Sequence, residues 1–347
     1  MNAVVDSKPA QRLSLWNSSL WNSRPWRRFK RSALALTGAL IVIAFLLLAA
    51  FSPLFATPNP NCLRDLGINE TGTNKTGTNE KQIPGILEPA RWRAILAAPA
   101  SCYTITRYSF SSEPTPPGTQ ALLGTVRGYD IYYGLVWGTR TMLTLGFVVV
   151  GATVFIGALV GLIAGFFGGI IDTIMMRLTD VIFAFPSLVL NIVLVAIFGP
   201  SLWNIALSFV IVGWPGYARV VRGEVLRVRT LEYVDAARAL GATPWRVMLR
   251  HVLPNSIGAL VVLAVLDMGT IPLFAGALSF LGLGTPLGYA DWGQLVQFAQ
   301  AWIQGPPKNP FAYWYVSFFP GLTILLFSLG WNLLGDALQD AFDPRAQ

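Results

Sequence analysis

Histidine, cysteine and charged residues are scarce in this chain of 347 residues, and each shortage excludes a class of function. The one histidine, His251, has no serine or cysteine partner in a recognisable arrangement, which argues against a Ser-His-Asp or Cys-His catalytic site. The two cysteines stand without a second pair of ligands, so the usual zinc spacing is missing. We therefore expect no catalytic site and no metal site. The chain also lacks a Gly-x-x-x-x-Gly-Lys-Ser/Thr loop, so we expect no nucleotide binding of that kind.

Apolar residues dominate the composition. Charged residues make up only 12% of the chain, against about 25% in soluble globular domains, whereas 54% are hydrophobic. This balance predicts a membrane protein. The net charge is +8, but the basic residues concentrate in segments 24–31 and 219–250, each beside a long apolar stretch. That pattern is typical of cytoplasmic flanks at an anionic membrane surface, so we expect a lipid bilayer and no nucleic acid as partner.

Six apolar stretches are long enough to cross a membrane, which takes about 20 residues of helix. They are residues 33–55, 142–166, 181–198, 202–217, 257–283 and 314–334. The sequence therefore predicts an all-α integral membrane protein with six transmembrane helices and an extracytoplasmic insertion between the first and the second.

The distribution of Lys and Arg predicts which segments lie inside. With the N-terminus inside, 16 of the 25 basic residues fall on the cytoplasmic side, so both termini are predicted cytoplasmic. The expected organisation is a basic N-terminal segment 1–32, a first helix 33–56, an insertion 57–139, a five-helix core 140–335 and a tail 336–347. The core includes a cytoplasmic loop, 219–256.

The insertion is polar and rich in proline, and it contains both cysteines, Cys62 and Cys102. The outer side of the membrane is oxidising, so a disulfide between them would close a segment that has little apolar content for a core of its own. The alternative is a pair of unbonded cysteines.

The loop 219–256 is too long for a simple connection, so we expect it to have structure of its own. Thr230 is suited to cap a helix that starts at Leu231, and Gly241 to end it. Thr243 and Pro244 then suit the start of a second helix, which we expect to end at Leu253-Pro254-Asn255.

The second of these helices presents the side chains of an interface. Arg246 and Arg250 lie four residues apart on one face, and Trp245 with Met248 or Leu249 offers apolar anchors beside them. The alternative is a loop packed on itself with solvated charges.

Two features inside the predicted spans stand out. Gly157, Gly161 and Gly165 recur every four residues, which lets a neighbouring helix approach closely; a hinge is the functional alternative. Asp267 is the one acidic residue well inside a predicted span, so it either lines a translocation path or pairs with a polar group of a partner protein.

Several motifs in order resemble one protein family. Asp235-Ala236-Ala237, Gly241 and Leu253-Pro254 are spaced as in the "EAA" loop of ABC importer permeases, with aspartate in place of the usual glutamate. Segments 184–187, 277–284, 291–293 and 332–336 are similar to dipeptide and oligopeptide permeases. The chain resembles the "C"-type subunit of such importers.

The resemblance implies a set of partners and a location. The family acts as a heterodimer with a second homologous permease, together with two cytoplasmic ABC ATPase subunits that bind ATP and Mg and an extracytoplasmic solute-binding protein. It implies the bacterial cytoplasmic (inner) membrane and no cofactor in this chain. The residues that would contact the ATPase are Glu232, Asp235, Ala236, Ala237, Gly241, Trp245, Arg246, Arg250, His251 and Pro254.

The resemblance further implies peptides as the cargo. Nickel chelates or another small solute are the alternative, since similar permeases handle them. A proton-coupled secondary transporter would carry several acidic residues in its spans, and a membrane enzyme would need a catalytic constellation; neither pattern is present in the sequence.

Overall fold

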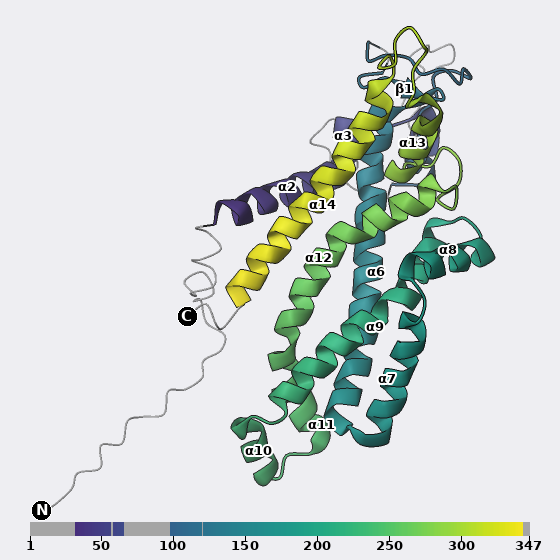
Figure 1. Cartoon of the computed structure of the whole chain (residues 1–347). Helices are drawn as coiled ribbons and strands as arrows, with labels where there is room; N and C mark the ends of the chain where they lie inside the picture. Colours follow the sequence, from purple (N-terminus) through teal and green to yellow (C-terminus); the bar gives the residue numbers. More distant parts are fainter. Residues whose placement is uncertain (1–31, 57, 66–97, 120, 343–347) are drawn as a thin grey trace, which may run out of the picture.

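The computed structural model describes residues 32–56, 58–65, 98–119 and 121–342. The basic block 24–31, the middle of the predicted insertion and residues 343–347 of the predicted tail lie outside this part. Long helices run through the described molecule, and short segments gather at one end of them (Figure 1).

Five of the helices are long and apolar enough to cross a membrane. They are α2 (Ala33–Ala50), α6 (Ile131–Phe167), α9 (Leu202–Val228), α12 (Leu253–Phe280), which continues a shorter helix without a break, and α14 (Trp314–Phe342). The bent pair α7 (Gly169–Phe183) and α8 (Ser187–Phe198) makes a sixth crossing if it counts as one span. The predicted all-α membrane fold is confirmed.

The third predicted span, 181–198, is wrong as a single helix. The chain breaks after Phe183, and α7 and α8 meet at 83°. Pro186 explains the break, because it has no N–H for a helical hydrogen bond and it disfavours helical geometry in the residue before it. The span is therefore a bent pair of helices.

Three other helices extend beyond their predicted ends. Helix α6 starts at Ile131 instead of residue 142, since the Asp130 carboxylate accepts a 3.2 Å hydrogen bond from the Tyr133 N–H and caps it. Helix α9 runs on to Val228 and α14 to Phe342, past residues 217 and 334. Residues 219–228, which we predicted as loop, and 336–342, predicted as tail, are therefore helical. Hydropathy marks the part of a helix suited to lipid, whereas the helix continues beyond that part.

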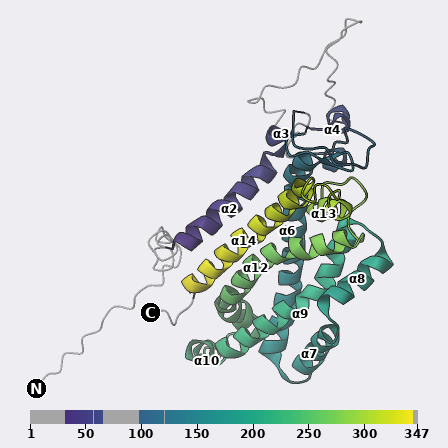
Figure 2. The ribbon, with the colours of Figure 1, turned by 45° about the horizontal axis from the view of Figure 1, so that its top comes forward.

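Helix α6 lies at the centre and contacts α2, α7, α9 and α12 (Figures 1 and 2). Its closest neighbour is α9, and the glycine series explains why. A methyl group on Gly157 or Gly161 would collide with Tyr217 or with the Ala218 carbonyl, and one on Gly165 would come within 2.8 Å of Val225. The glycines therefore serve the close helix packing that their spacing predicts.

The segments before α6 form a compact cap at one end of the bundle. They include α3 (Ser52–Phe55), α4 (Pro60–Asp65), η2 (Ala100–Tyr103) and the hairpin β1 (Thr125–Val126) and β2 (Tyr129–Asp130). From the other half of the chain, α13 (Trp292–Ala299) and η4 (Gln300–Trp302) join them.

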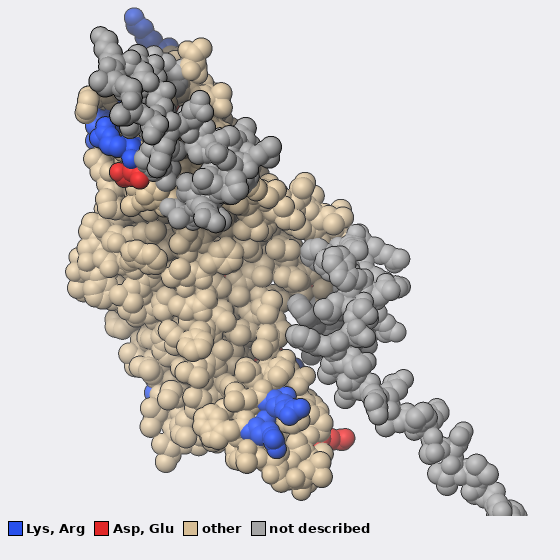
Figure 3. All heavy atoms as spheres, turned by 180° about the vertical axis from the view of Figure 1, so that it is seen from behind, with Lys and Arg blue, Asp and Glu red and all other residues tan. Residues whose placement is uncertain are grey.

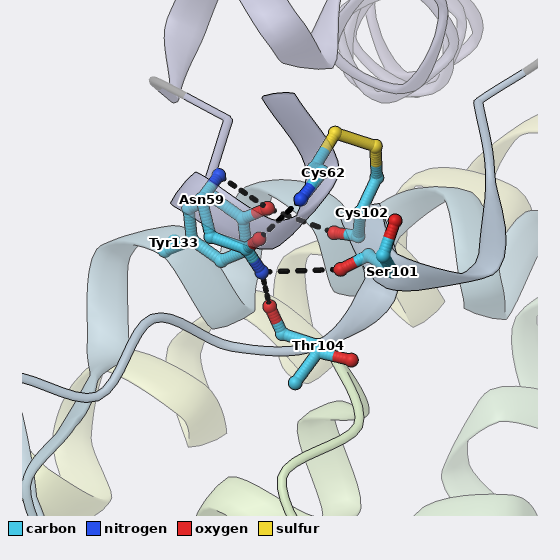
Figure 4. Close-up of a disulfide and its surroundings, with 6 residues drawn as sticks. All are labelled: Asn59, Cys62, Ser101, Cys102, Thr104 and Tyr133. Atoms are coloured by element: carbon cyan, nitrogen blue, oxygen red, sulfur yellow. Dashed lines mark hydrogen bonds between the residues drawn. A yellow bond between two sulfur atoms is a disulfide. The ribbon is translucent and has the colours of Figure 1, made fainter. Parts of the chain in front are cut away.

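A disulfide links α4 to η2, between Cys62 and Cys102 (Figure 4). Asn59 is the polar centre beside it. Its side chain accepts a 2.8 Å hydrogen bond from the Cys62 N–H and donates to the carbonyl oxygens of Ser101 and Thr104. The cap is thus held by a covalent bond and by the hydrogen bonds of the Asn59 side-chain amide, as expected for a segment with a small core.

On one face of the molecule, the charged side chains lie away from the middle. Seen from behind, the described Lys, Arg, Asp and Glu residues appear towards the two ends, and a broad band free of charge lies between them (Figure 3). A belt of this kind suits the hydrocarbon layer of a bilayer.

Candidate functional site

The loop that the sequence singled out lies at the end of the bundle opposite the disulfide cap (Figure 1). It consists of α10 (Glu232–Ala239), a corner at Gly241, α11 (Pro244–Val247) and a π turn, η3 (Met248–Val252). We call this segment, 229–255, the coupling loop. Its two helices stand beyond the ends of the long spans.

The corner between the two helices follows from three residues. Gly241 has a φ of +83°, a conformation that favours glycine. The Thr243 hydroxyl accepts a 3.4 Å hydrogen bond from the Arg246 N–H, and Pro244 is the first residue of α11. The sequence predicted all three roles.

Two predictions about the loop are wrong. Thr230 does not cap α10: Leu231 takes that position, and the Thr230 hydroxyl donates back to the Arg227 carbonyl at 2.9 Å, satisfying the end of α9. The second helix does not end at Leu253-Pro254-Asn255 either. It continues through η3 into α12, because Pro254 falls in the first turn of α12, where a missing N–H is tolerated.

The inner side of the coupling loop is firmly seated. Val234, Val247 and Met248 are at most 1% exposed and pack with Val225 and Val228 at the end of α9. Met248 is therefore a core residue and not the exposed anchor that its position suggested. Each such buried side chain contributes about 1.5–3 kcal/mol, so the loop is held firmly against the end of α9.

Polar and aromatic contacts tie the same loop to α6. The Arg229 guanidinium donates hydrogen bonds of 2.7 Å and 3.3 Å to the carbonyl oxygens of Gly165 and Phe166 in the last turn of α6. A cation at a helix C-terminus also favours the helix dipole. The Trp245 ring meets the edge of Phe167 with centroids 5.9 Å apart.

The outer side of the loop combines exposed apolar groups with arginines. Leu240 is 89% exposed, Trp245 57% and Leu249 53%, and Arg246 and Arg250 lie beside them. We call these five residues the coupling face. Large apolar groups beside arginines, held on a rigid seat, are typical of a protein–protein interface.

The other predicted docking residues lie around this face. Asp235 is exposed and pairs with Arg238 of the same helix at 3.1 Å. Glu232, Ala236 and Pro254 are exposed, whereas Ala237 and His251 are partly buried.

A second feature lies between the spans. A partly open cavity of about 240 Å³ is lined by α6, α9, α12 and the α7–α8 bend, and we call it the central cavity. Its walls are mainly apolar. Its polar lining residues are Thr153, Ser187, Asn191, Tyr217, Asp267 and Thr270.

Asp267 is the acidic group of this cavity. The Tyr217 hydroxyl donates a 2.6 Å hydrogen bond to one carboxylate oxygen, and the Thr270 hydroxyl lies 3.5 Å from the other. The sequence indicated Asp267 but missed Tyr217 and Asn191. Both are polar residues inside predicted apolar spans, and this could have marked them as candidates. Their positions in the sequence do not show that their helices pack beside the helix of Asp267.

Ion pairs join α7 to α9. Arg222 binds both carboxylate oxygens of Asp172, at 2.5 Å and 2.6 Å, and Arg219 binds Asp180 at 2.6 Å. The partners lie 39 and 50 positions apart along the chain, so these ion pairs fix how α7 packs against α9.

The bundle, the seated coupling loop and the central cavity define a membrane transport protein with several spans. A family profile described as "Binding-protein-dependent transport system inner membrane component" matches residues 157–347, and "N-terminal TM domain of oligopeptide transport permease C" matches residues 19–76. The chain belongs to the permease family of binding-protein-dependent transport systems, in the dipeptide and oligopeptide branch that its motifs resemble.

Individual relatives are similar in sequence to this protein over most of its length. It is 34% identical to the dipeptide transport system permease protein DppC of Alkalihalophilus pseudofirmus over 326 residues, 92% of this chain and 90% of the relative. It is 30% identical to the oligopeptide transport system permease protein OppC of Bacillus subtilis over 334 residues, 96% and 90% of the two chains. It is 39% identical to the glutathione transport system permease protein GsiD of Pectobacterium atrosepticum over 218 residues, 63% and 70% of the two chains.

Proposed function

We propose that the chain is the "C"-type transmembrane permease of an ABC importer for peptides. It forms the translocation path with a second homologous permease, receives solute from an extracytoplasmic binding protein and is driven by two cytoplasmic ABC ATPases. Its relatives support peptides or peptide-like solutes as the cargo, since they include permeases named for dipeptide, oligopeptide and glutathione transport.

The coupling loop is the observation that carries this proposal. Its coupling face is exposed, whereas Val234, Val247 and Met248 beneath it are buried in the bundle. An exposed apolar face that rests on closely packed side chains can transmit a movement of a bound partner to the bundle, because packed side chains yield little under force. We assign residues 232–255 as the docking segment for the ATPase.

A continuous helix connects this segment to the central cavity. Residues Pro244–Phe280 run from the coupling loop into α12. Trp245 of the coupling face and Asp267 of the cavity stand on this helix about 33 Å apart along its axis. Arg229 links the loop to α6 as well. Closure of the ATPase pair would therefore move α6 and α12 together against the partner permease, and so alternate access to the path between the two permeases.

The remaining assignments follow from this arrangement. ATP and Mg bind to the partner ATPases, and the chain itself carries no cofactor, no metal and no catalytic residue. The coupling loop marks the cytoplasmic side and the disulfide cap the outer side, which is oxidising. With that orientation the protein lies in the inner membrane with both termini in the cytoplasm.

To test the proposal, the complex is purified by an affinity tag on this chain, and its ATP hydrolysis and its uptake of peptide are measured. We expect vanadate-sensitive ATP hydrolysis stimulated by the peptide-loaded binding protein, with uptake of the peptide Ala-Ala into liposomes. Transport by the chain alone, with no ATPase, would contradict the proposal. Uptake of a nickel chelate without uptake of peptide would favour that alternative cargo.

A further inference from the structure

We propose that Asp267, Tyr217 and Asn191 form a recognition site for a primary ammonium group on the solute that crosses the membrane. The inference rests on the proposed function and adds the chemical class of the group that the central cavity selects.

The first observation is the set of partners around the Asp267 carboxylate. Within the described residues, the two groups that contact it are neutral hydroxyls, Tyr217 at 2.6 Å and Thr270 at 3.5 Å. Among the described residues that line the cavity there is no Lys, Arg or His. A carboxylate in an apolar span is costly without an opposite charge, so this site is suited to a cation that arrives with a ligand.

The second observation concerns Asn191 on α8, which is independent of Asp267. Asn191 is 5% exposed and lines the same cavity, and its Oδ1 atom has no hydrogen-bond partner in the part of the chain that the structure describes. A buried amide oxygen without a donor is uncommon, because it loses its hydrogen bonds to water without replacement. The residues that line the cavity thus include, besides the Asp267 carboxylate, a second acceptor for which the described residues supply no donor.

The third observation is depth. Asp267 and Tyr217 both lie near the middle of their helices, α12 and α9, and Asn191 follows the break between α7 and α8. In membrane transporters a broken helix near mid-depth is a common place for solute contacts. The two acceptors therefore lie where a solute on its way through the membrane would pass.

A primary ammonium group matches this site. It carries three donors and no acceptor, so it can bind the Asp267 carboxylate and the Asn191 oxygen and keep one donor for the solute or water. The hydroxyl of Tyr217 holds the carboxylate in place. Phe183, Phe209 and Phe274 line the cavity beside the polar groups and offer an apolar surface to the rest of the solute. A peptide with a free amino terminus has this combination of groups.

The experiment measures inhibition by a small ammonium ion. Ala-Ala uptake by the reconstituted complex is measured with n-butylammonium or with n-butanol, and each variant is compared with its own uninhibited rate. For the wild type and for Asp267→Glu we expect butylammonium to inhibit about tenfold more strongly than in Asp267→Asn. Butanol should not distinguish the variants. The binding protein is the same throughout, so any inhibition at that protein is common to all.

Asn191→Leu provides a second variant that keeps the carboxylate, and it should also lose part of the inhibition by butylammonium. Three results would overturn the inference: equal inhibition of the wild type by butylammonium and butanol, equal inhibition of the wild type and Asp267→Asn, or loss of the partner permease from the Asp267→Asn complex. The last result would mean that Asp267 pairs with a group on that partner. Absence of Ala-Ala uptake by the wild type would instead reject the proposed function, and the inference with it.

Discussion

Arg229, the first residue after α9, donates a 2.7 Å hydrogen bond to the carbonyl oxygen of Gly165 in the last turn of α6. The two residues lie 64 positions apart in the chain, and their contact joins the coupling loop to the central helix of the bundle. It satisfies a carbonyl group that the end of α6 leaves without a helical partner.

Replacement of Arg229 should therefore loosen the link between the coupling loop and α6. We expect Arg229→Ala to lower the stability by about 1–2 kcal/mol, because it removes a charge-assisted hydrogen bond and a favourable charge at a helix end. Thermal unfolding and the ratio of ATP hydrolysed to peptide transported are the measurements. Arg227→Ala is the matched control, since Arg227 is exposed and, in the described part of the chain, its ion pair is with Glu224 three residues away on the same helix. Equal effects of the two variants would contradict the assigned role.

The corner at Gly241 should be essential for docking. Gly241→Pro cannot adopt the φ of +83°, and Asp235→Lys reverses an exposed charge of α10. We expect both to abolish co-purification of the ATPase while membrane insertion stays normal. The control is Arg177→Gln, an exposed substitution on α7 away from the coupling face. Normal co-purification of Gly241→Pro and Asp235→Lys would reject the docking assignment.

The two positions Gly161 and Gly151 of α6 allow a matched test of helix packing. A Cβ atom on Gly161 would collide with the Ala218 carbonyl of α9, whereas no described atom lies within 4 Å of the position that a Cβ atom on Gly151 would take. We expect Gly161→Leu to destabilise the protein by about 3 kcal/mol and Gly151→Leu to have little effect. Thermal unfolding in detergent measures both. A hinge role for the glycines predicts instead that Gly161→Ala lowers transport without lowering stability.

The disulfide should stabilise the outer cap and leave the bundle unaffected. It closes a separation of 40 residues, for which the chain-entropy relation gives about 4 kcal/mol. Three changes remove the bond: chemical reduction of the disulfide, the single variant Cys62→Ser, and the double variant Cys62→Ser with Cys102→Ser. We expect all three to make the cap sensitive to protease to the same degree. A single variant much less stable than the double variant would show that a lone cysteine, and not loss of the bond, is responsible.

The stability should depend on pH through Asp291, which precedes α13 and is 1% exposed. Burial raises the pKa of its carboxyl above the ordinary value of 3.8, and hydrogen bonds from Ser279, Gly293 and Thr285 only partly oppose this. The folded state then binds a proton that the unfolded state has released. Stability should fall as pH rises from about 3.8 through the raised pKa. Asp291→Asn should reduce that slope in thermal unfolding from pH 4 to 7; an unchanged slope would contradict the assignment.

Local chemistry in the sequence predicted the elements that need few neighbours. The length of apolar stretches predicts spans, and Gly241, Thr243 and Pro244 act within one turn of their own position. For the two cysteines the sequence left a disulfide and an unbonded pair as alternatives, and the structure shows the disulfide.

Errors in the prediction arose where a residue has two local options. Thr230 can cap the following helix or bond back to the preceding one, and the structure shows the second. Met248 is apolar and next to exposed residues, so its burial depends on which way the helix turns towards the bundle. Pro254 commonly ends a helix, yet it is also accepted in a first turn.

The sequence by itself determined the membrane class, the number of apolar stretches, the helix corner of the coupling loop and, through ordered motifs, the family. Only the tertiary structure decided which polar groups meet: Tyr217 with Asp267, Arg222 with Asp172 and Arg229 with Gly165. The reason is physical. Caps, turns and hydropathy depend on residues a few positions apart, whereas these contacts join residues 50 or more positions apart that become neighbours only when the helices pack.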